Sequence, residues 1–194
     1  MKATPLLRWL ERALLAAGLL LGGWCAVVLF EAHRAATLSP PEPTSSIQTP
    51  VRGSWVAKLD APSVHLSATV LEGSDDATLG RAAGHIEETP FPWQSGNIGI
   101  AGHRDTTFRA VRHLHLGDPI ELTTAGSVYR YRVTKTFIVD PEDVYVLDPG
   151  AGPMLTLVTC YPFEFIGHAP HRYIIQAELV DQVSRTAKPG VAGG

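Results

Sequence analysis

The sequence predicts a mostly β domain with one or two short helices, preceded by a single N-terminal transmembrane helix. Two observations lead to this prediction. Over residues 53–180, short apolar stretches alternate with Gly, Pro and Asp, which is typical of strands joined by turns. Residues 13–30 form an uncharged apolar run that, at about 1.5 Å per residue, nearly crosses a hydrocarbon core of ~30 Å.

The apolar run predicts a signal anchor. Basic residues precede it, namely Lys2, Arg8 and Arg12. This bias favours a cytoplasmic N-terminus over residues 1–12 and an extracytoplasmic location for everything after Phe30, in a single-pass protein of the cell membrane. The alternative is a signal peptide cleaved after Ala35 or Ala36.

Residues 31–52 are expected to form a linker, because the stretch 37–50 is rich in Pro, Ser and Thr and has too little apolar surface to fold. Residues 181–194 are similarly poor in apolar side chains and are expected to form a flexible C-terminal tail. The folded domain is therefore assigned to residues 53–180.

Strand signals within this domain fall at 55–59, 66–71, 97–101, 120–123, 128–138, 154–159 and 173–180. The pattern is clearest in 128–138, where Tyr129, Tyr131, Val133 and Phe137 are expected on the core face. About seven short strands suit a closed barrel or a sandwich, and the periodicity does not choose between them.

A short helix is expected after His103. Asp105 is placed to cap its N-terminus, while Phe108, Val111 and Leu114 have the spacing of a face turned toward the core. An alternative role for Asp105 is to orient His103.

The composition limits the classes of function. The chain has 194 residues, 16 Lys and Arg against 19 Asp and Glu, and a formal net charge of −3. A nucleic-acid-binding domain normally presents a basic surface, so no nucleic-acid partner is expected. The two cysteines, Cys25 and Cys160, are not expected to pair, because Cys25 lies in the apolar run. A lone exported thiol is either buried and inert or kept for its reactivity.

Cys160 stands where a predicted strand ends, because Pro162 follows it closely and cannot continue a central ladder. Strand alternation places Cys160 on the face opposite the core residues Leu155 and Leu157, and it places Arg172 on the non-core face of the last strand. If these strands are neighbours, the thiol and the guanidinium open onto one surface. There Arg172 would favour the thiolate and hold the oxyanion that forms when a carbonyl is attacked.

His103 follows an apolar strand and Gly102, in a loop that offers no apolar face for its ring. An imidazole with a pKa near neutrality can protonate a departing amine and later accept a proton from an incoming one. The alternative without a catalytic role is a solvated or helix-capping histidine. His168 and His171, which lie near Cys160 in sequence, are the rival bases.

Three segments together resemble the sortase family: GHRDT around His103, TLVTC ending at Cys160, and RYII beginning at Arg172. The resemblance covers residues 53–180, and VLEGSDDATLGRAAGH and LTLVTCYPF resemble the class D branch. It implies a closed eight-stranded β-barrel with a groove that binds an LPxT-type sorting signal. In that family the cysteine attacks the threonine carbonyl to form a thioacyl enzyme, which an amine then resolves.

The resemblance assigns the catalytic roles to His103, Cys160 and Arg172. Thr159 matches a family hydroxyl that assists the oxyanion or the substrate, and it is equally well read as an ordinary strand residue. The implied partners are exported proteins with a C-terminal LPxT-type signal, an amine acceptor such as a cell-wall peptide or a pilin lysine, and the membrane. No cofactor is expected.

No metal site is expected either. His113 and His115 could point the same way but lack a third ligand. Some sortases bind calcium through loop carboxylates, but the scattered acidic pairs of this chain are not assigned to a site.

Two other functions fit parts of the sequence. L,D-transpeptidases also use Cys and His on an exported β-rich domain, but they usually carry an Arg within two residues after the cysteine, where this chain has Tyr161 and Pro162. The remaining alternative is an exported β-barrel binding module in which Cys, His and Arg are inert.

Overall fold

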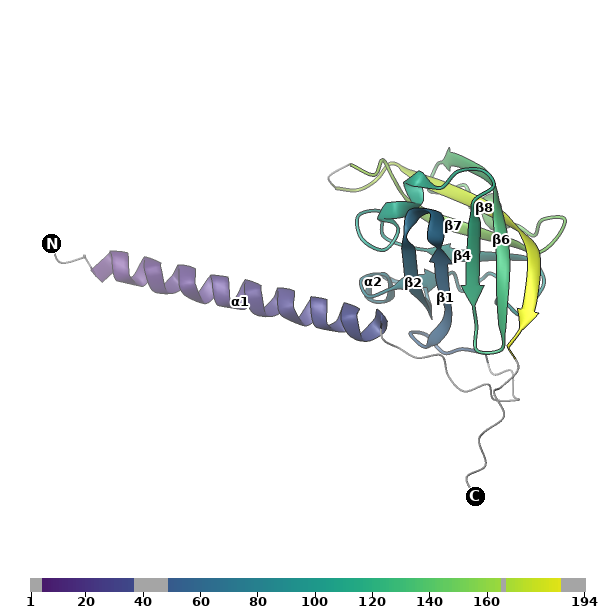
Figure 1. Ribbon diagram of the computed structural model, residues 1–194. Helices are drawn as coiled ribbons and strands as arrows, with labels where there is room; N and C mark the ends of the chain where they lie inside the picture. Colours follow the sequence, from purple (N-terminus) through teal and green to yellow (C-terminus); the bar gives the residue numbers. More distant parts are fainter. Residues whose placement is uncertain (1–4, 37–48, 165–166, 186–194) are drawn as a thin grey trace, which may run out of the picture.

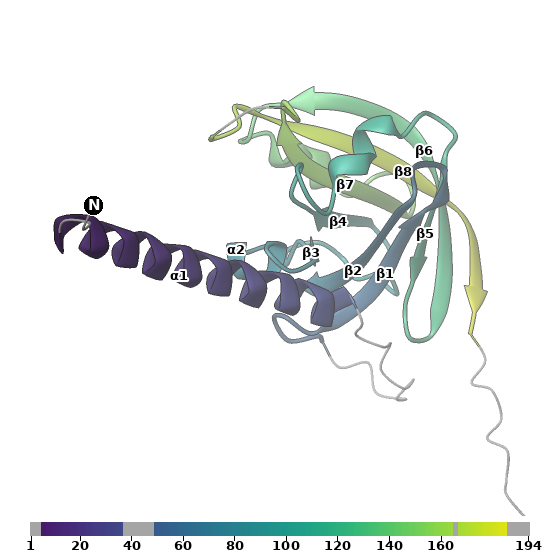
Figure 2. The same ribbon diagram turned by 60° about the vertical axis from the view of Figure 1, so that its left-hand side comes forward.

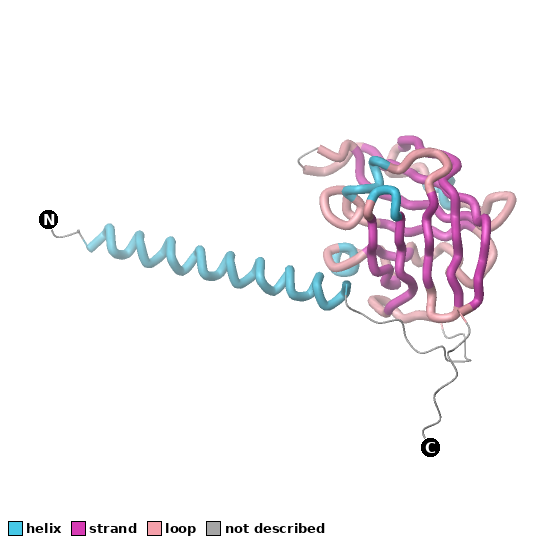
Figure 3. The backbone as a smooth tube through the Cα atoms, in the orientation of Figure 1, coloured by secondary structure: helices cyan, strands magenta, loops and turns pink. Residues whose placement is uncertain are grey.

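The computed structural model describes residues 5–36, 49–164 and 167–185, and it consists of one long helix followed by a β-barrel (Figures 1 and 3). Helix α1 (Pro5–Ala36) contains a stretch, Trp9–Glu31, with a mean hydropathy of 2.3 and none of its surface buried. This stretch is long and apolar enough to cross a membrane, and it includes the expected span 13–30. Most of the predicted linker (37–48) and of the predicted tail (186–194) lies outside the described residues.

The barrel is closed by eight strands in the order β1-β2-β3-β4-β7-β8-β6-β5. Figure 2 labels the strands from a second side. The strands are β1 (Trp55–Ala61), β2 (Leu66–Glu72), β3 (Ala83–His85), β4 (Asn97–Ala101), β5 (Pro119–Thr123), β6 (Ser127–Val139), β7 (Met154–Tyr161) and β8 (His171–Ser184). The pairs β2–β3 and β4–β7 are parallel, and the others are antiparallel. The eight-stranded barrel is confirmed, and the sandwich is excluded.

Four short helical segments connect the strands: α2 (Asp76–Leu79) and the 3₁₀ helices η1 (Pro62–Val64), η2 (Arg109–His113) and η3 (Val144–Leu147). The Asp75 side chain caps α2 by accepting hydrogen bonds from the amides of Ala77 and Thr78. The bond from the Thr78 amide lowers the pKa of this carboxyl.

The core fills the interior of the barrel with the inward-facing residues of every long strand. Leu59, Ile98, Ile120, Leu155 and Ile175 are among the side chains that are fully buried there. Burial of apolar surface on this scale is the main stabilising contribution to a fold of this kind. The barrel wall therefore provides a rigid support for side chains that point outward.

The predicted core face of β6 is wrong at its last residue, Phe137. Tyr129, Tyr131 and Val133 lie in the core as expected, but Phe137 lies on the outer surface of β6. The register with β8 shifts between Val133 and Lys135. One extra residue reverses the alternation of side chains, so Phe137 pairs with the outward-facing Ile174.

One strand and one boundary also differ from the prediction. The three-residue strand β3 has no periodicity long enough to detect, and the sequence prediction missed it. Strand β8 continues to Ser184, so the expected boundary at residue 180 falls inside a strand. Its polar end pairs with β6, where Arg130 forms an ion pair with Asp181 at 2.8 Å.

The helix expected after His103 is a 3₁₀ helix that begins at Arg109. Phe108, Val111 and Leu114 are buried as predicted, but Asp105 does not cap the helix, because the residue at the cap position is Phe108. The backbone between His103 and Phe108 forms turns, closed by a hydrogen bond from the Phe108 amide to the His103 carbonyl.

Candidate active site

Strand register brings Cys160 and Arg172 together. Strands β7 and β8 are antiparallel neighbours, and Cys160 lies directly opposite Arg172. The two preceding outward positions of β7 pair in the same way, Val158 with Ile174 and Thr156 with Gln176. Directly paired residues of antiparallel strands share a face, so Cys160 and Arg172 lie on the same face of the sheet.

His103 reaches the same level from the other side of β7. Strands β4 and β7 are parallel, with Ala101 opposite Val158. Beyond this pair the Gly102 amide donates a hydrogen bond to the Val158 carbonyl at 3.1 Å, which keeps the two chains in register past the end of β4. Two residues beyond Ala101 and Val158 are His103 and Cys160.

His103, Cys160 and Arg172 therefore occupy one row across three adjacent strands. Neighbouring strands lie about 4.8 Å apart, so the backbone positions of the outer two are separated by roughly 10 Å. All three residues are half-buried.

Gly102 fixes the turn that precedes His103. A Cβ atom at this position would lie 2.6 Å from the ring of Phe108, which is itself fully buried. No side chain larger than hydrogen fits without displacing that ring. The backbone before the imidazole is thus packed directly on the core.

Thr159 stabilises the same turn through a hydrogen bond. Its hydroxyl donates a 2.7 Å hydrogen bond to the Gly102 carbonyl, and the residue is only 2% exposed. Alternation in β7 places Thr159 on the core side, opposite to Cys160. The hydroxyl therefore bonds the loop that carries His103. The sequence had left two roles open for Thr159, an ordinary strand residue or a hydroxyl that assists the oxyanion or the substrate.

The Arg172 side chain is held by backbone carbonyls. Its Nη1 donates to the carbonyl oxygens of His171 at 3.1 Å and Ala169 at 3.3 Å. Its Nε and Nη2 make no hydrogen bond with the part of the chain that the structure describes. The guanidinium therefore keeps donors available beside Cys160, which is the requirement for binding an oxyanion.

The outer face beside this row is apolar. Phe137, Val139, Val158 and Ile174 from β6, β7 and β8 pack with Val146 and Leu147 of η3. Val158 and Ile174 pair with each other two residues away from Cys160 and Arg172, on the same face. Ile174, Val139 and Val146 are buried in this contact, so η3 covers the apolar cluster next to Cys160.

A buried polar network attaches η3 to the barrel. The Asn97 amide donates to the carbonyls of Val146 at 2.9 Å and Asp148 at 3.1 Å, and it accepts from the Thr156 hydroxyl at 2.7 Å. Gln176 donates a second bond to the Val146 carbonyl. Sequence reasoning missed this function, although a polar residue at the start of the apolar strand NIGIA was a signal of it.

A groove of about 650 Å³ runs between η3 and the segment that follows β3. Ile86 and Thr89 line one wall, and Val144 and Leu147 line the other. Glu87 lies at its edge, where its own backbone amide, the Ser74 hydroxyl and Arg52 lower the pKa of the carboxyl. Arg52, Glu88 and Asp148 also line the groove, so its lining is partly apolar and partly charged.

The rival histidines are placed less well. His171 lies opposite Tyr161, one residue out of phase with Cys160, and its Nδ1 lies 2.9 Å from a carboxylate oxygen of Asp140. His168 is exposed in the loop before β8. Neither belongs to the row.

No group of three or more potential metal ligands occurs among the described residues. His113 lies in η2 and His115 follows it, without a third ligand within the described part of the chain.

Residues 59–180 match the family model of the sortase domain. Sortase D of Bacillus subtilis is 35% identical over 132 residues, covering 68% of this chain and 67% of that protein. Sortase SrtE1 of Streptomyces coelicolor is 33% identical over 153 residues, and the match spans 43% of that relative's length.

Solved structures agree with these relatives. A sortase D5 transpeptidase of Clostridium perfringens superposes with a TM-score of 0.65 at 28% identity, covering 80% of this chain and 98% of the other. Sortase E1 of Streptomyces coelicolor, solved with a tripeptide in its active site, gives 0.64 at 31% identity and covers 73% and 98%.

The chain belongs to the sortase family of cysteine transpeptidases. Within the family it is class D-like. Membership excludes the L,D-transpeptidase and favours an enzyme over an inert binding module. It implies substrates that carry sorting signals and acceptors that carry amines, and the apolar helix α1 fits a membrane anchor for such an enzyme.

Proposed function

We propose that this protein cleaves an LPxT-type sorting signal through a thioacyl intermediate on Cys160 and transfers the acyl group to an amine. The observation that carries the proposal is the row of His103, Cys160 and Arg172 across β4, β7 and β8. Cys25, the other thiol, lies within the apolar stretch of α1.

In the acylation step the Cys160 thiolate attacks the carbonyl carbon of the threonine. The carbonyl oxygen becomes an oxyanion, which accepts hydrogen bonds from Arg172. His103, as imidazolium, donates its proton to the departing amine, the carbon–nitrogen bond breaks, and a thioester remains on Cys160.

In the second step an incoming amine attacks the thioester. Neutral His103 accepts the proton from that amine, the carbon–sulfur bond breaks, and the Cys160 thiolate is regenerated with a new amide as product. Because the proton lost in the first step is regained in the second, the enzyme returns to its starting state.

Val158 of β7 and Leu147 of η3, which stay partly exposed at the border of the buried cluster under η3, support binding of the leucine and proline of the signal. The bias of basic residues before α1 supports a cytoplasmic N-terminus, with the barrel on the outer side of the membrane.

The test compares the two cysteines in the full-length chain, purified in a neutral detergent. Cys160→Ala is expected to abolish cleavage of a fluorogenic LPxT-type peptide and formation of the thioacyl adduct in mass spectra. Cys25→Ala is the matched control and should retain both. Cleavage by Cys160→Ala at the parent rate would remove Cys160 from the mechanism.

A further inference from the structure

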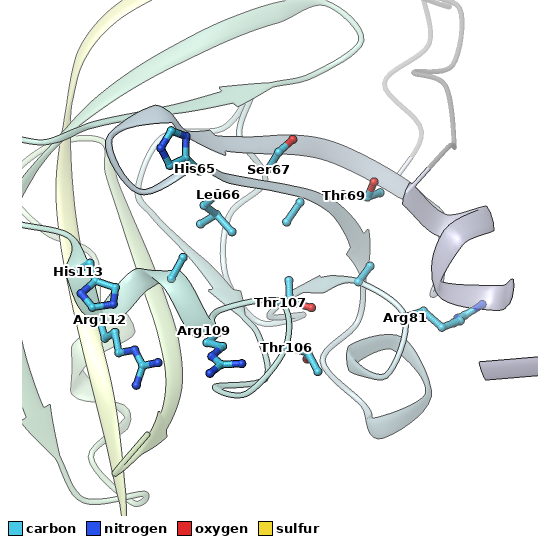
Figure 4. Close-up of a pocket in the computed structure, with 13 residues that line it drawn as sticks. His65, Leu66, Ser67, Thr69, Arg81, Thr106, Thr107, Arg109, Arg112 and His113 are labelled. Atoms are coloured by element: carbon cyan, nitrogen blue, oxygen red, sulfur yellow. The ribbon is translucent and has the colours of Figure 1, made fainter. Parts of the chain in front are cut away.

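A basic pocket borders the candidate active site on the side away from Arg172. Its volume is about 450 Å³, within the range typical of small-ligand sites. It lies between β2, the turn before β3, and the segment 106–113 that follows His103 (Figure 4).

The pocket adjoins His103 by strand register. Strands β3 and β4 are antiparallel, with Gly84 opposite Ala101. Continuing this register by two residues brings Ala82, which lines the pocket, level with His103. Thr106, another lining residue, belongs to the turn that His103 begins. The row of side chains therefore leads from Arg172 through Cys160 and His103 to the pocket wall.

The charged side chains of the pocket have one sign. Arg81, Arg109 and Arg112 line it together with His65 and His113, and no Asp or Glu is among the lining residues. Hydroxyl groups of Ser and Thr residues supply further donors between them. An arrangement of arginines and hydroxyls without carboxylates is suited to a carboxylate or a phosphate.

The arginines are differently engaged. Arg112 packs over the Phe163 ring at 5.6 Å and reaches the highly exposed Glu164 at 3.4 Å, while its Nε is buried without a hydrogen-bond partner in the described structure. The Arg81 Nε donates to the Ala77 carbonyl. The exposed Arg109 side chain makes no hydrogen bond with any described residue. Its full set of donors is therefore available to a ligand.

The position relative to His103 identifies which substrate the pocket faces. In the proposed function, which this inference extends, His103 exchanges protons with the amines, while the acyl chain lies over β7 and β8. An amine that approaches His103 from the side of β3 has the basic pocket behind it. We infer that this pocket binds an acidic group, carboxylate or phosphate, carried by the amine acceptor.

The test measures the acceptor KM in transpeptidation by the full-length chain in neutral detergent. Triglycine and triglycinamide differ only in the terminal carboxylate, and three extended residues reach roughly 10 Å. O-phosphoethanolamine against ethanolamine makes the same comparison for a phosphate. The parent should show a KM about tenfold lower for the acidic member of at least one pair, and the pair that discriminates identifies the group.

Variants assign the effect to the pocket. In the discriminating pair, the KM of the neutral acceptor divided by the KM of the acidic acceptor should fall toward one in Arg109→Gln. It should fall further in Arg109→Glu. Arg132→Gln, which removes the same charge from the exposed face of β6, is the control and should keep the parent ratio. Equal KM values within both pairs for the parent, or an unchanged ratio in both Arg109 variants, would overturn the inference.

A binding measurement separates this inference from the proposed function. Saturation-transfer NMR on the full-length Cys160→Ala chain should detect triglycine more strongly than triglycinamide without any turnover. If the parent forms no product with any acceptor, the proposed function fails, and this comparison still decides whether the pocket selects acids. Equal saturation transfer to both peptides, with equal KM values, would refute the pocket alone.

Discussion

Replacement of Thr159 by valine tests whether the hydrogen bond to Gly102 positions His103. Valine has nearly the same shape, so the change removes a hydroxyl without leaving a cavity. The lost bond is short, at 2.7 Å, and the residue is 2% exposed, so the Gly102 carbonyl is left without a partner in a buried place. Leaving such a group unsatisfied costs about 1–3 kcal/mol.

We expect the free energy of unfolding of the barrel to fall by about 2 kcal/mol, which lowers the melting temperature by roughly 6 °C. We also expect kcat to fall by a factor of about 10–100, with little change in KM for the signal peptide, because small displacements of a catalytic group are costly. Thr159→Ser, which keeps the hydroxyl, should restore most of kcat. Calorimetry and steady-state cleavage of a fluorogenic peptide measure the two effects.

Thr124→Val is the matched control. Thr124 is also buried, and its hydroxyl donates to the Ser127 carbonyl at 3.0 Å, but it lies in the β5–β6 turn, at the opposite end of β6 from the pair of Val139 with Arg172. It should lower stability to a similar extent while kcat stays at the parent value. Equal losses of kcat in both valine variants, or no rescue by serine, would refute a positioning role for Thr159.

Two further predictions concern Arg172, which pairs with Cys160, and Asn97, which attaches η3 to the barrel. Arg172→Ala should lower kcat/KM for the signal peptide by about 10²–10³, the effect of losing one oxyanion donor, and a nearly normal rate would exclude that role. Asn97→Ala should destabilise the barrel by about 2–3 kcal/mol, because the Asp148 carbonyl and the Thr156 hydroxyl lose their partner and the Val146 carbonyl keeps only its bond from Gln176. It should also raise KM for the signal peptide more than it lowers kcat, and an unchanged KM would separate η3 from substrate binding.

The sequence was sufficient where a single strand carried its own pattern. Leu155 and Leu157 defined the inward face of β7, and Cys160 followed by parity on the outward face. The same parity placed Arg172 on the outward face of β8. No single-strand pattern shows that these two strands are neighbours. That information comes from the order of strands in the barrel.

Sequence reasoning failed where one residue changes the phase. The irregularity between Val133 and Lys135 carries no glycine or proline to announce it. A strand drawn with unbroken alternation therefore buried Phe137 in the core. In the same way β3, with three residues, is too short for a period, and it becomes a strand only because Ala83, Gly84 and His85 pair with β2.

The register shift in β6 places an apolar side chain, Phe137, on the outer face where η3 packs. Without it, Thr136 would take the place of Phe137 beside Ile174, and a polar hydroxyl would interrupt the surface formed with Val139 and Val146. With it, an inward tyrosine-rich half of β6 completes the core, and an outward apolar half adjoins β8 near Arg172. A single strand thereby serves both the interior of the barrel and the apolar cluster that holds η3 on its outer side.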